Sequence, residues 1–165
     1  MAVFAYVIGL GKADGLEMDF ISPVLAAASW IGIAGSGLVI LLSTRFGRAW
    51  PLAGSILLTA LATWALHGSE TAWVYALANG LIGVTWSFGI PYLLGMCAQF
   101  DQTGQSAALG GFASKMGMAS GPLVAAWVVG ADDFSRVINV GAVALVLSLV
   151  AAMVPAILLD RAPID

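Results

Sequence analysis

Five stretches of this sequence are almost free of charge and long enough to cross a lipid bilayer. They are residues 20–44, 49–69, 71–100, 102–131 and 137–159. A transmembrane helix needs about 20 apolar residues, so each stretch can cross once. Apolar residues are continuous in these stretches, whereas a barrel strand alternates over about 9–11 residues. We therefore expect helices near 21–43, 50–67, 72–98, 106–129 and 136–158.

The chain has too little polar surface for a soluble domain. Hydrophobic residues make up 61% of its 165 residues and charged residues 9%, against about 45–50% and about 25% in ordinary soluble domains. More than half of a small domain's accessible surface stays in water after folding, so this much apolar surface could not be hidden. The composition excludes a soluble enzyme and predicts an all-α, polytopic transmembrane helical bundle with membrane lipid as its solvent.

Particular residue types argue against several other classes. The net charge is −3 and no basic run occurs, which argues against nucleic-acid binding. Cys97 is the single cysteine, so the sequence offers neither an internal disulfide nor a Cys/His metal cluster. It also contains no zinc-protease, serine-hydrolase or nucleotide-binding motif. We expect no enzyme activity, no metal and no cofactor.

The first apolar segment, at 2–11, is too short to span a bilayer. Its ten residues would make about 15 Å of helix, half of a hydrocarbon core. We expect it to be the end of a helix whose beginning is missing, because a lone half-helix would leave its first backbone donors unpaired in hydrocarbon. The later links are short, which predicts antiparallel neighbours in one transmembrane domain over 1–165.

Basic residues near helix ends set the orientation of a membrane protein. Arg45, Arg48 and Arg161 lie on one side of the expected bundle, and Lys12 and Arg136 lie on the other. We expect the side with three arginines, which includes the C-terminus, to be cytoplasmic, with the bundle in the inner membrane.

Small residues recur every fourth position in three expected helices. The series are 28, 32 and 36; 113, 117, 121 and 125; and 144, 148 and 152. Such seams let helices pack closely in lipid. They would also let helices slide between two states, and the sequence leaves both interpretations open.

Two prolines mark expected helix bends. Pro91 and Pro122 each remove one hydrogen bond inside a helix. The carbonyls of Ser87 and Met118, four residues earlier, are thereby freed. Gly121 loosens the turn beside Pro122.

Lys115 lies near the middle of its expected helix, where a charge costs about 2.5–3.5 kcal/mol on insertion scales. No Asp or Glu occupies the middle of any expected span. Three interpretations remain open. Lys115 faces an aqueous cavity and binds an anionic or polar solute, or it pairs with a group on another chain or on a missing part of this one. In the third interpretation, free backbone carbonyls and water accept the hydrogen bonds of its amino group.

Tyr75, Asn79 and Trp86 fall on one face of the helix expected at 72–98. Aromatic and amide groups of this kind can stack on and hydrogen-bond an organic solute, which makes them candidate substrate ligands with Lys115. The alternative is that Tyr75 belongs to the aromatic belt at the membrane surface and that Asn79 joins neighbouring helices.

Two parts of the sequence resemble the C-terminal half of the major facilitator superfamily. The stretch 45–48, with Pro51 opening the next span, is similar to the family's cytoplasmic loop motif in its copy between helices 8 and 9. The stretches 101–105 and 117–122 resemble its loop 10–11 and helix 11.

Within the loop motif, Arg45, Gly47 and Arg48 match the family, and Thr44 stands where the family has an acidic residue. The resemblance implies that these three residues belong to a conformational switch loop that works through a charge network and a helix end. The missing acid leaves half of that network unaccounted for.

The resemblance covers essentially the whole chain and implies a secondary transporter. The chain would supply helices 7 to 12, with 2–11 as a truncated helix 7. Carriers of this kind enclose a midplane site between two halves and open it alternately to either side. The implied function is transport of a small organic solute across the cytoplasmic membrane, together with a missing N-terminal half or a second copy. The alternative is a non-transporting half-bundle, either an assembly partner or a truncated remnant.

Overall fold

The computed structural model describes residues 2–42, 45–100, 103–129 and 133–161, which are almost entirely helical. The elements are α1 (Ala2–Ala13), α2 (Met18–Leu42), α3 (Ala49–Ala65), the 3₁₀ turn η1 (Leu66–Gly68), α4 (Ala72–Gln99), α5 (Gln105–Val129) and α6 (Phe134–Arg161). The described ranges contain no strand, so the all-α class is confirmed. α2 begins earlier than expected because the carbonyl of Glu17 already accepts the amide of Ile21, at 3.0 Å.

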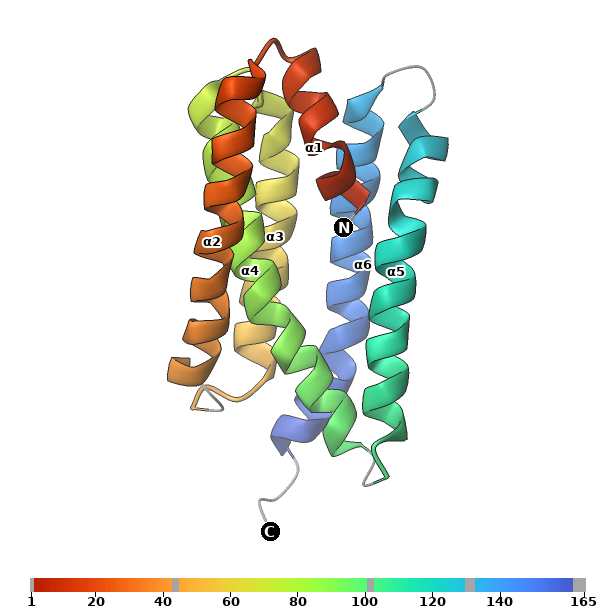
Figure 1. Ribbon diagram of the computed structural model, residues 1–165. Coiled ribbons are helices and arrows are strands. Elements are labelled where there is room, and N and C mark those ends of the chain that lie inside the picture. Colours follow the sequence, from red (N-terminus) through yellow and green to blue (C-terminus); the bar gives the residue numbers. More distant parts are fainter. Residues whose placement is uncertain (1, 43–44, 101–102, 130–132, 162–165) are drawn as a thin grey trace.

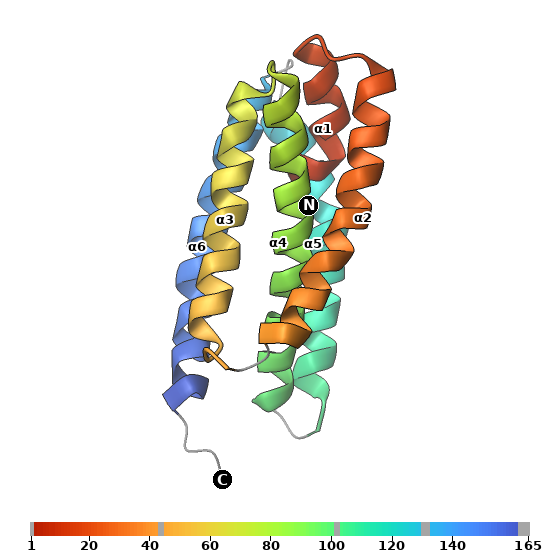
Figure 2. The ribbon, with the colours of Figure 1, turned by 90° about the vertical axis from the view of Figure 1, so that its left-hand side faces the viewer.

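The helices α2 to α6 run side by side and alternate in direction (Figure 1, Figure 2), and α4 crosses the bundle obliquely in Figure 1. α4 packs on α2 and α3, α3 also packs on α6, and α5 lies against α1, α4 and α6. The N-terminal end of the short α1 lies about midway along the bundle (Figure 1). The α2–α3 connection and the end of α6 lie together, so the side that holds Arg45, Arg48 and Arg161 is formed as expected.

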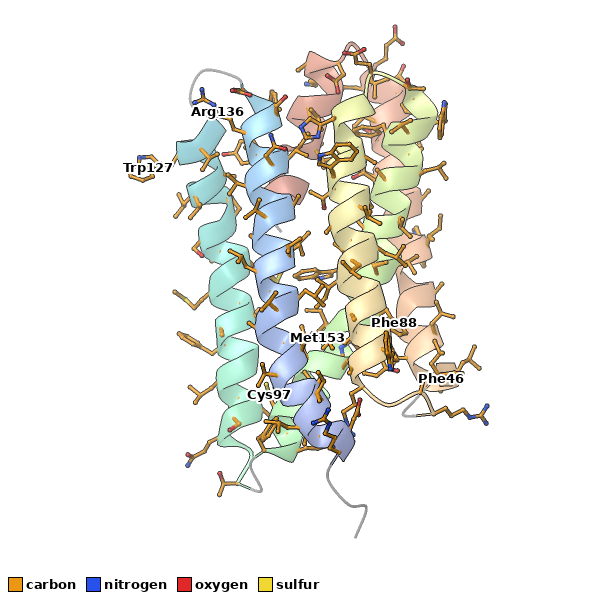
Figure 3. All side chains as sticks on the ribbon, turned by 180° about the vertical axis from the view of Figure 1, so that it is seen from behind. Phe46, Phe88, Cys97, Trp127, Arg136 and Met153 are labelled. Carbon is orange, nitrogen blue, oxygen red and sulfur yellow. The ribbon has the colours of Figure 1, made fainter. Side chains whose placement is uncertain are left out.

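Large apolar side chains lie on the outside of the bundle. Trp127 is 92% exposed and Trp50 is 81% exposed, and Trp127 extends away from α5 in Figure 3. An apolar surface of this extent is unusual on a soluble protein. Four of the described helices are long and apolar enough to cross a membrane: α2, α3 with η1, α4 and α6. The bundle is therefore compatible with a membrane protein.

α5 has the length of a membrane span but a lower apolar content. It is 25 residues long, contains Lys115, and is not among the four helices that qualify by length and composition. It nevertheless runs beside α6 over most of the height of the bundle (Figure 1). Five crossings were expected from the sequence, and the crossing by α5 stays a prediction.

α2 and α4 touch through their backbones. A Cβ atom at Gly35 would lie 2.1 Å from the carbonyl oxygen of Val84, and one at Gly83 would lie 2.8 Å from that of Ala28. Only glycine allows so close an approach, and close approach is how helices gain packing energy in lipid. Two members of the α2 series, Ala28 and Gly32, take part in this packing, since a Cβ atom at Gly32 would lie 3.3 Å from the carbonyl oxygen of Gly83. In the series on α5, by contrast, Gly117 has open space at its Cβ position.

A hydroxyl group compensates for the proline in α4. Pro91 frees the carbonyl of Ser87 from the helical pattern, and the hydroxyl of Ser36 on α2 donates to this carbonyl at 3.5 Å. Neighbouring helices commonly satisfy backbone groups that proline frees inside a membrane. The bond adds a polar link to the glycine contact between α2 and α4.

Replacing Gly35 by alanine tests this contact. We expect Gly35→Ala to lower the free energy of unfolding by about 1–3 kcal/mol, because the added methyl forces two backbones apart. Gly37→Ala is the matched control, since no atom lies within 4 Å of a Cβ at that position. Denaturant titration in micelles measures both variants, and equal stabilities would contradict the close contact.

Candidate functional site

A cavity of about 330 Å³ lies among the middle turns of α2, α4 and α6, with contributions from α1 and α3. Its volume falls within the range of known ligand pockets, about 300–1,000 Å³. The lining residues are Val7, Ala28, Ser29, Gly32, Thr59, Thr63, Ile82, Gly83, Trp86, Ser87, Gly141, Ala144, Leu145 and Ser148. The cavity could therefore hold a small organic molecule near the middle of the bundle.

Hydroxyl groups of α3 line one side of this cavity. The hydroxyl of Thr59 donates to that of Thr85 on α4, with 2.7 Å between the oxygens. Thr85 in turn donates to the carbonyl of Leu81, at 2.8 Å. These buried polar groups satisfy one another, as buried polar groups must, and they fix α3 against α4 beside the cavity.

Besides the hydroxyl of Ser87, two hydrogen-bond donors at the cavity have no acceptor among the described residues. Thr63 is only 3% exposed, and its hydroxyl has no hydrogen-bond partner within the described chain. The half-buried Trp86, a sequence-predicted ligand, also has no acceptor there for its indole N–H. A ligand with an acceptor atom could satisfy either group.

Tyr75 and Asn79 lie outside the cavity lining and are both fully buried. The hydroxyl of Tyr75 donates to the carbonyl of Val7 at 3.1 Å, which joins α4 to α1. The side-chain amide of Asn79 donates to the carbonyl of Tyr75 at 2.8 Å, while its oxygen has no partner among the described residues. Their role as substrate ligands stays a prediction, and their contacts are those of packing residues.

Lys115 also lies apart from the cavity. It is exposed on α5, which contributes no lining residue. No ion pair joins it to another residue in the described ranges.

The switch-loop residue Arg45 and the helix-bend residue Pro91 are also exposed. Arg45 forms no ion pair with another described residue. Pro122 is half-buried, and its backbone carbonyl accepts a hydrogen bond from the hydroxyl of Tyr6 at 3.2 Å, which joins α5 to α1.

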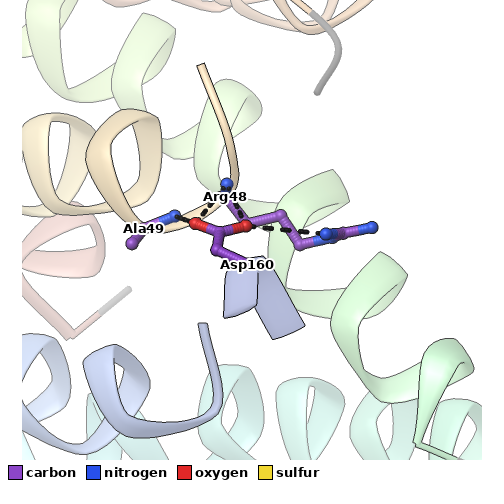
Figure 4. A network of polar contacts seen from close by, with 3 residues as sticks. All are labelled: Arg48, Ala49 and Asp160. Carbon is purple, nitrogen blue, oxygen red and sulfur yellow. Dashed lines mark hydrogen bonds and ion pairs between the residues drawn. The ribbon is translucent and has the colours of Figure 1, made fainter. Parts of the chain in front are cut away.

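Asp160 on α6 caps the start of α3 (Figure 4). Its carboxylate accepts the backbone N–H of Arg48 at 2.8 Å and that of Ala49 at 2.9 Å. The guanidinium of Arg48 adds an ion pair at 3.5 Å. A carboxylate at a helix N-terminus satisfies unpaired donors and interacts favourably with the helix dipole. We call these three residues, Asp160, Arg48 and Ala49, the Asp160 clamp.

Gly47 is required beside the clamp for two separate reasons. Its φ is +70°, a conformation that side chains other than glycine's rarely adopt. A Cβ there would also lie 2.7 Å from an oxygen of Asp160. The sequence singled out Gly47 and Arg48 through the loop motif but missed Asp160. The one available signal was a carboxylate at the end of the last expected helix, next to Arg161.

Comparison with known protein families, with characterised proteins and with solved structures finds no match for this chain. Among the residues that the structure describes, no group of three or more His, Cys, Asp or Glu side chains could hold a metal ion. The candidate site consists of the uncharged cavity and, at one end of the bundle, the Asp160 clamp.

The substitution Asp160→Asn tests the clamp. We expect it to lower the free energy of unfolding by about 0.5–1.5 kcal/mol, because the amide keeps only one of the two acceptor oxygens and loses the ion pair with Arg48. Glu70→Gln is the control, because Glu70 is exposed and its carboxylate has no hydrogen bond or ion pair within the described residues. Denaturant titration in micelles compares the two, and an Asp160→Asn variant as stable as the control would refute the cap.

Proposed function

We propose that this chain is a secondary transporter, or the C-terminal half of one, that moves a small organic solute across the cytoplasmic membrane by alternating access. The observation that carries the proposal is the cavity of about 330 Å³, lined by the middle turns of α2, α4 and α6. Substrate sites of such carriers lie near the bilayer midplane, between helices that move relative to one another. The resemblance of the sequence to the major facilitator superfamily is consistent with this function.

The Asp160 clamp supplies a candidate switch for this proposal. It joins the end of α6 to the start of α3 through residues 112 positions apart in the sequence. Polar bonds at a helix end can break and re-form without exposing a charge to hydrocarbon. In this proposal the clamp holds α3 and α6 together in one state and opens in the other, at the side proposed to be cytoplasmic, and Asp160 takes the place of the acid that the loop motif lacks.

A partner is part of the proposal. Lys115 is exposed on α5, which crosses the membrane in this proposal, and no carboxylate occupies the middle of any expected span in this sequence. A second copy would therefore offer no acid at that depth. A partner half with an acidic or hydrogen-bonding group at the midplane would satisfy the ammonium group and cover α5.

A non-transporting half-bundle is the second candidate function. The observation that favours it is the surface of α5, where Trp127 is 92% exposed and Leu109 and Leu123 are 67% and 73% exposed. An assembly module needs such a face, but it needs neither a midplane cavity nor a clamp that opens. The two functions therefore differ in whether the cavity is reached from both sides of the membrane.

Labelling of an introduced thiol distinguishes these functions without knowledge of the substrate. Cys97→Ala removes the native thiol, and Ser148→Cys places one at the cavity. Transport predicts labelling by an impermeant maleimide in both right-side-out and inside-out vesicles. Ser135→Cys, at the exposed start of α6, should be labelled from one side only and reports vesicle orientation.

The clamp should control this access. Adding Asp160→Asn to the Ser148→Cys chain should increase labelling from the side of Arg48, because α3 and α6 separate more readily there. Labelling from a single side, unchanged by Asp160→Asn, would refute alternating access and favour the half-bundle.

A further inference from the structure

The cavity is uncharged over its entire lining. Its polar members are serine and threonine hydroxyls and the indole of Trp86; the remaining members are glycine and aliphatic residues. α5, which carries Lys115, takes no part in the lining. An ion held against this lining would give up part of its hydration without gaining a countercharge from the described residues, which is unfavourable.

The hydrogen-bonding groups of the cavity differ from one wall to the other. On α2 and α6 the hydroxyl protons are already used: Ser29 donates to the carbonyl of Leu25 at 2.9 Å, and Ser148 donates to that of Ala144 at 2.8 Å. On α3 and α4 the hydroxyls of Thr63 and Ser87 and the indole N–H of Trp86 have no acceptor in the described part of the chain. The α3–α4 wall therefore offers donors to a ligand.

The apolar part of the lining completes the description of a ligand. Ile82 on α4 and Leu145 on α6 contribute aliphatic surface, and Trp86 contributes a flat aromatic surface. Aromatic rings pack favourably on one another in offset or edge-on arrangements. A ligand with an aromatic ring would match Trp86 in shape and polarity.

We propose that the cavity binds an uncharged organic solute with an aromatic or other apolar body and with hydroxyl or ether oxygens that accept hydrogen bonds from Thr63 and Trp86. The inference rests on the proposed function and names the substrate class of the same site. It assigns Lys115 to pairing with a partner instead of binding an anionic substrate. Trp86 is then a specificity-determining residue, and charge on the solute is selected against.

Three probes that differ at one carbon test the charge selection. Phenyl β-glucoside is neutral, phenyl β-glucuronide carries a carboxylate at C6, and phenyl 6-amino-6-deoxy-β-glucoside carries an ammonium group there. We expect saturable binding of the glucoside to the full chain in lipid nanodiscs, at least tenfold tighter than that of either charged probe. Equilibrium dialysis against empty nanodiscs provides the measurement.

Two tryptophan variants locate the binding. Trp86→Phe keeps an aromatic ring but removes the indole donor, and we expect it to weaken glucoside binding about fivefold, roughly one net hydrogen bond. Trp127→Phe is the matched control, because Trp127 is 92% exposed on α5; it should bind the glucoside as the unaltered chain does. Thr63→Val, which removes the second donor, should weaken binding to a similar degree.

Each contrary result overturns the inference in a recognisable way. Absence of saturable glucoside binding, equal binding of all three probes, or tighter binding of the glucuronide contradicts an uncharged solute. Equal losses in Trp86→Phe and Trp127→Phe contradict its location. The thiol-labelling test uses no ligand, so the two proposals can fail separately. Labelling from both sides without glucoside binding would reject only the substrate class. Glucoside binding with labelling from one side would reject only transport.

Discussion

The backbone contact between α2 and α4 is the interaction on which the rest of this bundle depends. Lipid tails are as apolar as leucine, so helices in a membrane associate through close packing and not through the hydrophobic effect. Gly35 meets the carbonyl of Val84, and Gly83 meets that of Ala28, at distances that no side chain would allow. α4 then lies between α2 and α3, and α6 packs against α3. Gly83 and Ala28 also line the cavity, so the contact that joins the helices also shapes the candidate site.

Polar groups are distributed along the bundle according to the cost of burying them. Charged groups such as Asp160 and Arg48 meet at the end of the bundle, where the ion pair retains partial exposure. The centre contains hydroxyls that bond to one another or to backbone carbonyls, such as Thr59 and Thr85. Lys115 is the exception, a charge in the middle of a helix, and its exposure on α5 places it where a partner could reach it.

The sequence predicted the helices well because a membrane span is a local property of the chain. The run of apolar residues and the charges at its ends fix each helix without reference to its neighbours, and for that reason α4 begins at the expected residue 72. The weaker apolar content of α5 shows the limit of that reasoning: one lysine and several small residues leave its crossing a prediction.

The candidate site was predicted only in part because it depends on which helices face one another. Trp86 was named from its residue type, and it does line the cavity. Asn79 and Tyr75 share its helical face but lie about two and three turns nearer the start of α4, where Val7 of α1 and Ile21 of α2 pack on Tyr75. The contribution of α3 through Thr63, and the pairing of Asp160 with a loop 112 positions away, are long-range contacts that no local pattern contains.

A membrane-embedded bundle is the claim that every other conclusion requires, and extraction of membranes with alkaline sodium carbonate tests it most directly. This treatment opens vesicles into sheets and strips proteins that are held by polar contacts alone, but it leaves spanning helices in the lipid. The chain should remain entirely in the membrane pellet and should enter solution only with detergent. Recovery of a monodisperse chain in the carbonate supernatant would contradict the bundle, the cavity and the proposed transport together.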